Sequence, residues 1–313
     1  THRKNPLNRF IAYHLLPYYG AYNDWTVSGD VKTTCAKMDL IDCTDWYKTL
    51  MPGTLMKFSS PQQGLYINRK GLGALATVEG VKVLSPSEMG SGIDQQALNG
   101  IYHYVDKILE FDEAMRDQVC NDRIRISSAT ITPEFMNCGA RGNTLRATGF
   151  KVVEGWDFHG KTPSMTFRKR DVWMVTYADC VDMVGQFDVT FSLLPVPKTD
   201  TYEVRFAYGW GDMRGKVQIY FGTDPDNLQP VGLPIDFTLW PADPLIGWVE
   251  DTGDPETDRA IDKAMHNRGY MKDMDSWQQG GVNVLRDNGA KFRKILVTET
   301  MNPNQDYYIR IKL

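Results

Sequence analysis

The sequence predicts a mainly β protein, in which an α+β N-terminal part is followed by an antiparallel β-sandwich. The first observation is alternation: in the stretch 201–208, apolar residues (Tyr202, Val204 and Phe206) alternate with charged ones, as in a half-buried strand. The second is that no helical patterns alternate with these strands, which disfavours a parallel α/β fold. The third is length, since 313 residues, at roughly 100–200 residues per domain, indicate two domains.

The N-terminal part begins with an amphipathic helix over residues 7–16, which Pro17 ends. One face of this helix is apolar and consists of Leu7, Phe10, Ile11 and Leu15. Beyond the turn signal at Met51-Pro-Gly, three short strands are expected at 55–58, 65–68 and 81–84. The stretch 101–109 is rich in β-branched and aromatic residues and predicts a further strand.

The second part is expected to hold about seven strands separated by Pro and Gly turns, the pattern of an antiparallel sandwich. These strands are expected at 123–127, 171–177, 186–192, 201–208, 216–221, 292–300 and 307–313. Residues 241–281 interrupt them with Pro, Gly and many charges, and with a helix at 255–267. An excursion of this length from a β-domain is functional or caps one face of a sheet.

Charge argues against a nucleic-acid partner. The formal net charge is −4 and the pI is about 5.8, whereas nucleic-acid binders carry a basic surplus or patch. The densest basic run, Arg168-Lys169-Arg170, is followed at once by Asp171 and is interpreted as a solvated turn. No run of about 20 apolar residues is present, so the sequence predicts no membrane-spanning segment.

Five cysteines are present: Cys35, Cys43, Cys120, Cys138 and Cys180. They form no Cys-x-x-Cys pair, which argues against a zinc site or a thioredoxin-like motif. Free thiols are the main expectation, and a Cys35–Cys43 disulfide is the alternative. Both ends of the sequence look cut, and we expect any export signal to lie outside it.

Three features of the N-terminal part resemble the second half of a fasciclin domain. They are the pair Tyr13-His14, the Gly-Val-x-Val pattern at 80–83, and the run Leu98-Asn-Gly-Ile-Tyr-His-Tyr-Val-Asp over 98–106. The resemblance covers about residues 5–112. It implies a fasciclin-like domain over 1–118 whose N-terminal part is missing, and an adhesive surface at Tyr13 and His14. The remaining 119–313 form the predicted β-sandwich domain, which carries the 241–281 insertion.

The second part is similar to the C-terminal region of fasciclin-domain surface lipoproteins from gut Bacteroidetes. The matching pieces are Arg123-Ile-Arg-Ile, Thr132-Pro-Glu-Phe-Met-Asn, Arg141-Gly, Gly247-Trp and the run 262–271. This resemblance implies a surface-exposed protein of the outer membrane, held by a lipid anchor outside this sequence. It also implies partners, namely a TonB-dependent transporter and its associated lipoproteins.

Catalytic patterns are missing from the sequence. The five His residues have no metalloprotease spacing, and neither a Gly-x-Ser-x-Gly elbow nor a phosphate-binding loop occurs. A polysaccharide hydrolase needs only two facing carboxylates, so this alternative stays open, with Asp236, Asp243 and Glu250 as candidates. No cofactor is expected. Structural calcium at Asp224-Pro-Asp-Asn or Asp251-Thr-Gly-Asp is weighed against ordinary turns and helix caps.

Aromatic residues beside loops are the best candidates for ligand contact, because sugars present C–H faces that stack on flat rings. These candidates are Trp210, Trp240, Trp248, Tyr270 and Trp277. The competing interpretation is that these rings fasten the insertion to the sheet.

The sequence therefore predicts a non-enzymatic binding or adhesion protein of the cell surface, an accessory of an outer-membrane complex for nutrient uptake, with a glycan or peptide as ligand. The alternatives are a polysaccharide hydrolase and a purely structural subunit of a surface assembly. A hydrolase requires a cleft with facing carboxylates. A binding protein requires a shallow aromatic surface, and a structural subunit requires a large exposed apolar patch.

Overall fold

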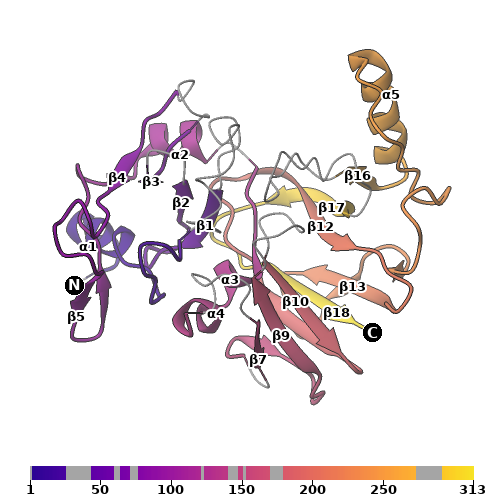
Figure 1. The fold of residues 1–313 in the computed structure, drawn as a ribbon, viewed down its shortest axis with the longest axis horizontal. Helices are drawn as coiled ribbons and strands as arrows, with labels where there is room; N and C mark the ends of the chain where they lie inside the picture. The colour runs from indigo at the N-terminus through magenta and orange to yellow at the C-terminus, as the bar shows by residue number, and fades with distance from the viewer. Residues whose placement is uncertain are drawn as a thin grey trace.

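The computed structural model describes residues 2–25, 44–59, 64–70, 77–120, 123–139, 147–150, 153–169, 179–272 and 291–313. Within these ranges the protein is mainly β, and every strand pairing is antiparallel, as the sequence predicts. The indigo and purple N-terminal part lies on one side of the molecule, and the orange and yellow C-terminal strands lie on the other (Figure 1).

The helices of the described residues are short, and several begin with a side-chain cap. They are α1 (Pro6–Tyr13), α2 (Glu113–Val119), α3 (Ser128–Ile131), α4 (Pro133–Asn137) and α5 (Pro255–His266). Asn5, Asp112 and Asp254 accept backbone N–H groups at the starts of α1, α2 and α5. Helix α5 confirms the helix expected in the insertion; it projects outward beside β16 (Figure 1), and its Met265 is buried in the C-terminal core. None of the described helices is long and apolar enough to span a bilayer.

The N-terminal part contains a four-stranded sheet of order β1-β2-β3-β4 and a separate hairpin, β5-β6. The bounds are β1 (Thr44–Lys48), β2 (Leu55–Ser59), β3 (Leu65–Ile67), β4 (Val81–Val83), β5 (Gln95–Ala97) and β6 (Gly100–Tyr102). The strands expected at 55–58, 65–68 and 81–84 are therefore confirmed. A third sheet, of order β10-β9-β7, follows in the chain. Its strands are β7 (Ala147–Phe150), β9 (Ser164–Lys169) and β10 (Asp179–Val184).

Two antiparallel sheets form the C-terminal part. One has the order β14-β13-β18-β11-β8, with β15 also paired to β13, and the other has the order β12-β17-β16. The bounds are β8 (Trp156–Asp157), β11 (Asp188–Ser192), β12 (Asp200–Gly209), β13 (Lys216–Gly222), β14 (Gln229–Pro230), β15 (Ile235–Asp236), β16 (Tyr270–Lys272), β17 (Lys291–Met301) and β18 (Tyr308–Lys312). The strands expected near 186–192, 201–208, 216–221, 292–300 and 307–313 are thus confirmed.

Alternation creates one apolar core between these two sheets. Val217, Ile219 and Phe221 of β13 are buried, while the residues between them are partly exposed. Tyr208 and Phe292 of the other sheet belong to the same buried cluster. Both sheets therefore contribute side chains to the same buried cluster.

A second core lies in the N-terminal part and extends beyond it. Tyr47 and Phe58 belong to this cluster, and so do Phe135, Met165 and Phe167. The cluster thus takes side chains from both sides of residue 118, where the sequence analysis places its domain boundary. That boundary stays a prediction.

Helix α1 differs from the prediction in length and in the face that it buries. It ends at Tyr13, and Tyr13 is its one buried side chain. The Tyr13 hydroxyl accepts a hydrogen bond from Asn68 at 2.7 Å, which fixes the ring in the core. The predicted apolar face is exposed instead; it consists of Leu7, Phe10, Ile11 and Leu15.

Two predicted strands are wrong. The stretch 101–109 continues β6 only to Tyr102 and is then irregular, with one isolated bridge from Val105 to Val83. Residues 123–127 are also irregular, because Ser127 caps α3 and the Arg125 guanidinium binds the Asp45 carboxylate.

The basic run at 168–170 was expected in a turn, but Arg168 and Lys169 belong to strand β9. Arg170 lies outside the described residues, as do the expected strand at 171–177, Cys35, Cys43 and Trp277. Cys120 and Cys138 are free thiols.

Candidate functional site

Among the predicted ligand-binding rings that the structure describes, Trp240 is the most exposed, at 59%. It lies beside Trp210, with ring centroids 4.3 Å apart and planes at 70°, so the edge of one ring meets the face of the other. The structure therefore brings together two of the aromatic residues that the sequence analysis selected. An edge-to-face partner restricts the Trp240 ring while leaving it open to solvent.

Backbone hydrogen bonds join the two segments that carry these rings. Trp210 directly follows β12, and the next residue, Gly211, donates its N–H to the Phe237 carbonyl at 2.9 Å. Phe237 in turn donates its N–H to the Gly215 carbonyl at 3.1 Å. These bonds hold the turn after β12 against the segment that leads to Trp240, so the ring pair has a rigid base.

Polar groups lie on the same turn as Trp210. Asp212 and Arg214 are exposed there, one residue on either side of the fully exposed Met213. An exposed ring with a carboxylate and a guanidinium on the adjoining turn is suited to a ligand with both C–H faces and hydroxyl groups. We call the region around Trp210, Asp212, Arg214 and Trp240 the tryptophan surface.

The other described aromatic candidates belong to the supporting structure. Tyr270 is only 8% exposed and packs against Phe292, so its ring is not available to a ligand. Trp248 is half-buried against the C-terminal core, with the Lys272 ammonium 5.9 Å from its ring centroid. These two rings fasten the insertion to the sheet, as the competing interpretation proposed. Trp277 lies outside the described residues.

The two residues proposed as an adhesive surface, Tyr13 and His14, also differ in their exposure to solvent. Tyr13 is 1% exposed, and burial raises its pKa far above the usual range, so it is a neutral core residue. His14 is half-exposed and its Nδ1 lies 2.7 Å from the Phe10 carbonyl oxygen. The structure therefore presents only one member of the pair to solvent.

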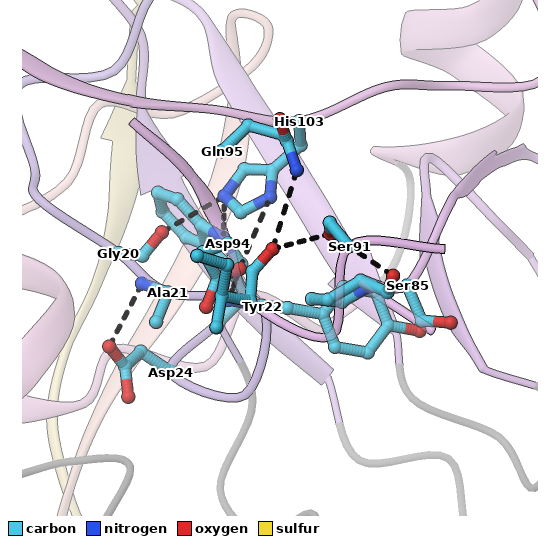
Figure 2. Close-up of polar contacts among 12 residues, drawn as sticks. Gly20, Ala21, Tyr22, Asp24, Ser85, Ser91, Asp94, Gln95 and His103 are labelled. Atoms are coloured by element: carbon cyan, nitrogen blue, oxygen red, sulfur yellow. Dashed lines mark hydrogen bonds and ion pairs between the residues drawn. The ribbon is translucent and has the colours of Figure 1, made fainter. Parts of the chain in front are cut away.

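His103, the histidine within the fasciclin-like run, links two segments of the N-terminal part (Figure 2). Its Nε2 lies 2.9 Å from the Gly20 carbonyl oxygen and 3.2 Å from Trp25 Nε1. Its Nδ1 faces Asp94 at 3.9 Å, and the same carboxylate accepts the Tyr22 N–H at 2.9 Å. His103 and Asp94 thus fasten residues 20–25 to the hairpin region, which is a structural role.

Of the three carboxylates proposed for a hydrolase, Asp236 is unsuited to the role of general acid. Hydrogen bonds from the Thr238 hydroxyl and from Lys216 lower the pKa of Asp236 to about 2. A glycosidase acid needs a raised pKa so that it holds its proton at neutral pH. The Asp243 carboxylate accepts the Leu245 N–H at 2.9 Å within a turn. Glu250 is exposed on the following segment.

The two oxygen-rich motifs form local turns and caps. Asp224 accepts the Asp226 N–H at 3.1 Å, and Asp254 accepts the Thr257 N–H at 2.9 Å at the start of α5. Among the described residues, no group of three or more His, Cys, Asp or Glu side chains is placed to hold a metal ion.

Sequence reasoning missed the most strongly paired charged residues. Lys272 is buried and binds the Asp251 carboxylate, with Asp262 at 3.9 Å. Arg310 binds both carboxylate oxygens of Asp188 from a strand 122 residues away. Each pair joins distant segments of the chain, and no short motif indicates it.

Comparison with known proteins does not assign the chain to a family. No family model matches the sequence, and comparisons with curated proteins and with solved structures find no significant match.

Proposed function

We propose that this protein is a non-enzymatic binding protein of the cell surface that holds a glycan on the tryptophan surface. The observation that carries the proposal is the Trp210–Trp240 pair, in which one indole is braced edge-on and the other is 59% exposed. A large exposed ring beside charged side chains is the usual arrangement where sugar rings stack and their hydroxyls form hydrogen bonds.

We also propose that the chain consists of a fasciclin-like α+β part followed by a β-sandwich. The resemblance of residues 5–112 and 120–313 to fasciclin-domain surface lipoproteins supports it, as does the mainly β content with two sheets around one core. From the same resemblance we propose a lipid-anchored accessory of an outer-membrane uptake complex. Its partners would be a TonB-dependent transporter and associated lipoproteins.

Binding of oligosaccharides to the full chain tests the glycan site. Cello-, malto- and mannohexaose are titrated while the tryptophan fluorescence is recorded. Trp240→Ala should abolish binding to whichever oligosaccharide binds the wild type, because it removes the exposed stacking ring. Tyr104→Ala is the matched control, since Tyr104 is also a large exposed ring, 45% accessible, but lies in the N-terminal part. Equal affinity of the wild type and Trp240→Ala would contradict the proposal.

A structural subunit of a surface assembly is the second candidate, and exposed apolar side chains near the tryptophan surface favour it. Met213 and Leu233 are almost fully exposed on the segments that flank β13, and Leu245 and Val249 are exposed in the insertion. A native pull-down from the source membrane, analysed by mass spectrometry, separates the two. Stoichiometric recovery with other surface proteins, together with no oligosaccharide binding, would favour the structural subunit.

A further inference from the structure

One face of the β11–β18 pair is turned away from the core and carries polar side chains. Along β11, Val189 points into the core, whereas its neighbours Asp188 and Thr190 lie on the opposite face. Thr190 pairs with Arg310 and Ser192 with Tyr308 across the antiparallel ladder, and directly paired residues share a face. This face continues to the edge strand β8, where Asp157 pairs with Thr190.

A solvent-open cavity of about 190 Å³ lies at one end of this polar face. Its volume exceeds what one water molecule needs and falls below that of a pocket for a drug-sized ligand. It therefore suits a ligand of one small ring. The walls come from four strands and three loops, and the residues used below are Lys48, Asp157, Thr190, Ser192, Asp306 and Tyr308.

His159 fixes two of these polar groups. Its Nε2 lies 2.8 Å from the Thr190 hydroxyl, and its Nδ1 lies 3.3 Å from the Asp157 carboxylate. The same carboxylate accepts the backbone N–H of His159 at 2.8 Å, and this residue has a left-handed φ of 47°. The turn thus clamps the imidazole between Asp157 and Thr190. Groups held in place before binding lose less conformational entropy when a ligand arrives.

The chemistry of the walls selects a neutral polyhydroxylated ligand. Asp157, Asp306 and Lys48 line the cavity, and the charge of the nearby Arg310 is balanced by Asp188, so the local charge is unfavourable for phosphate or another anion. The exposed Ser192 adds a hydroxyl that both donates and accepts, while the buried Thr190 hydroxyl is held by His159. Sugar hydroxyls donate to carboxylates and accept from an ammonium. The phenol ring of Tyr308 offers apolar surface to the C–H groups of the same sugar.

We infer that this cavity is a binding site for a single neutral sugar ring, separate from the tryptophan surface. The two regions lie at opposite ends of β13. Gly222 at one end pairs with Tyr308 of the cavity, and Lys216 at the other end pairs with Asp236, close to the turn of Trp210. At about 3.3 Å per residue, this strand separates the two regions by roughly 20 Å. A ligand in the cavity therefore does not need the tryptophan pair.

Saturation-transfer NMR on the full chain tests the inference with the methyl glycosides of glucose, galactose, mannose and N-acetylglucosamine. Ser192→Trp fills the cavity from an exposed strand position, and Thr300→Trp places the same ring on an exposed position of β17 as the control. Asp306→Asn removes a charged acceptor without changing the shape. Circular dichroism melting shows which variants are folded.

We expect saturation transfer to at least one glycoside in the wild type, in Thr300→Trp and in Trp240→Ala, and none in the double variant that combines Trp240→Ala with Ser192→Trp. Asp306→Asn should bind about tenfold more weakly, because it loses a hydrogen bond to a charged group. No transfer to any of the four glycosides, or equal transfer in Trp240→Ala and in the double variant, would overturn the inference. Loss of transfer in Trp240→Ala alone would assign the signal to the tryptophan surface and overturn the cavity site as well.

Discussion

The guanidinium of Arg310 binds both carboxylate oxygens of Asp188, at 2.6 and 2.7 Å. The carboxylate is nearly buried, and the Tyr220 ring lies 5.5 Å from the guanidinium carbon on the other side. A two-pronged ion pair of this kind has a defined geometry that a single contact lacks. It joins β11 and β18, the strands that carry the proposed sugar cavity.

Arg310→Met should destabilise the protein by about 2–4 kcal/mol, because it leaves the Asp188 carboxylate buried without its main partner. Urea unfolding followed by circular dichroism measures this difference. Lys216→Met is the control: Lys216 pairs with Asp236 at 2.9 Å but is largely exposed, so its loss should change the stability by less than about 1 kcal/mol. Similar effects of the two substitutions would show that burial does not strengthen the Asp188 pair.

The same pair predicts a pH dependence of stability. The Arg310 hydrogen bonds lower the pKa of Asp188 below its value in the unfolded chain, which is about 3.9. The stabilisation is therefore fully present above about pH 4 and is lost as the pH falls through the folded pKa. The stability difference between the wild type and Asp188→Asn should be constant near neutral pH and shrink in acid. A difference that grows in acid would contradict this assignment.

The buried Lys272 is expected to hold the insertion in place. It binds Asp251, which lies in the insertion, and its own carbonyl accepts a hydrogen bond from Arg293 at 2.6 Å. Lys272→Met should cost about 3 kcal/mol, because it leaves the Asp251 carboxylate without its cation. Limited proteolysis should then cleave within 241–272 faster than in the wild type. Lys263→Met, on the exposed side of α5, is the control and should leave both measurements unchanged.

Gly80 is required by both its backbone angle and its surroundings. Its φ is +78°, and an added Cβ would lie 2.5 Å from the Ile67 carbonyl oxygen. Gly92 has a similar φ of +68° but open space around it. Gly92→Ala should therefore cost only the left-handed backbone term, about 1–2 kcal/mol, and Gly80→Ala about 1–3 kcal/mol more. If thermal unfolding showed the same loss of stability for both substitutions, the Ile67 carbonyl oxygen would not restrict the side chain at position 80.

The thiol of Cys120 should be unreactive. Burial raises its pKa to about 11, so almost none of it is thiolate at neutral pH. Cys138 is only partly buried. Alkylation by iodoacetamide, mapped by mass spectrometry, should modify Cys138 before Cys120 under native conditions. In denaturant the two should react at similar rates, and faster native labelling of Cys120 would contradict its burial.

Local sequence patterns were sufficient to predict the elements in which buried and exposed positions alternate regularly along the chain. The alternation in 201–208 and 216–221 predicts β12 and β13, because a strand with one face in the core must alternate. Residues 123–127 alternate too, yet they are irregular. In this segment Ser127 caps helix α3 and Arg125 forms an ion pair with Asp45, in place of strand pairing. The apolar pattern of α1 correctly predicted a helix but not the face that it buries.

The sequence by itself determined the mainly β class, the strands around the C-terminal core, helix α5 and the set of aromatic residues among which Trp210 and Trp240 were found. Only the tertiary structure decided which rings are exposed, and it buried Tyr13 and Tyr270 while leaving Trp240 open. It also decided the long-range pairs, such as Asp188 with Arg310, and the cavity beside Thr190. The physical reason is range: periodicity records only whether a residue faces a core, whereas pairing, exposure and cavities depend on segments that meet after folding.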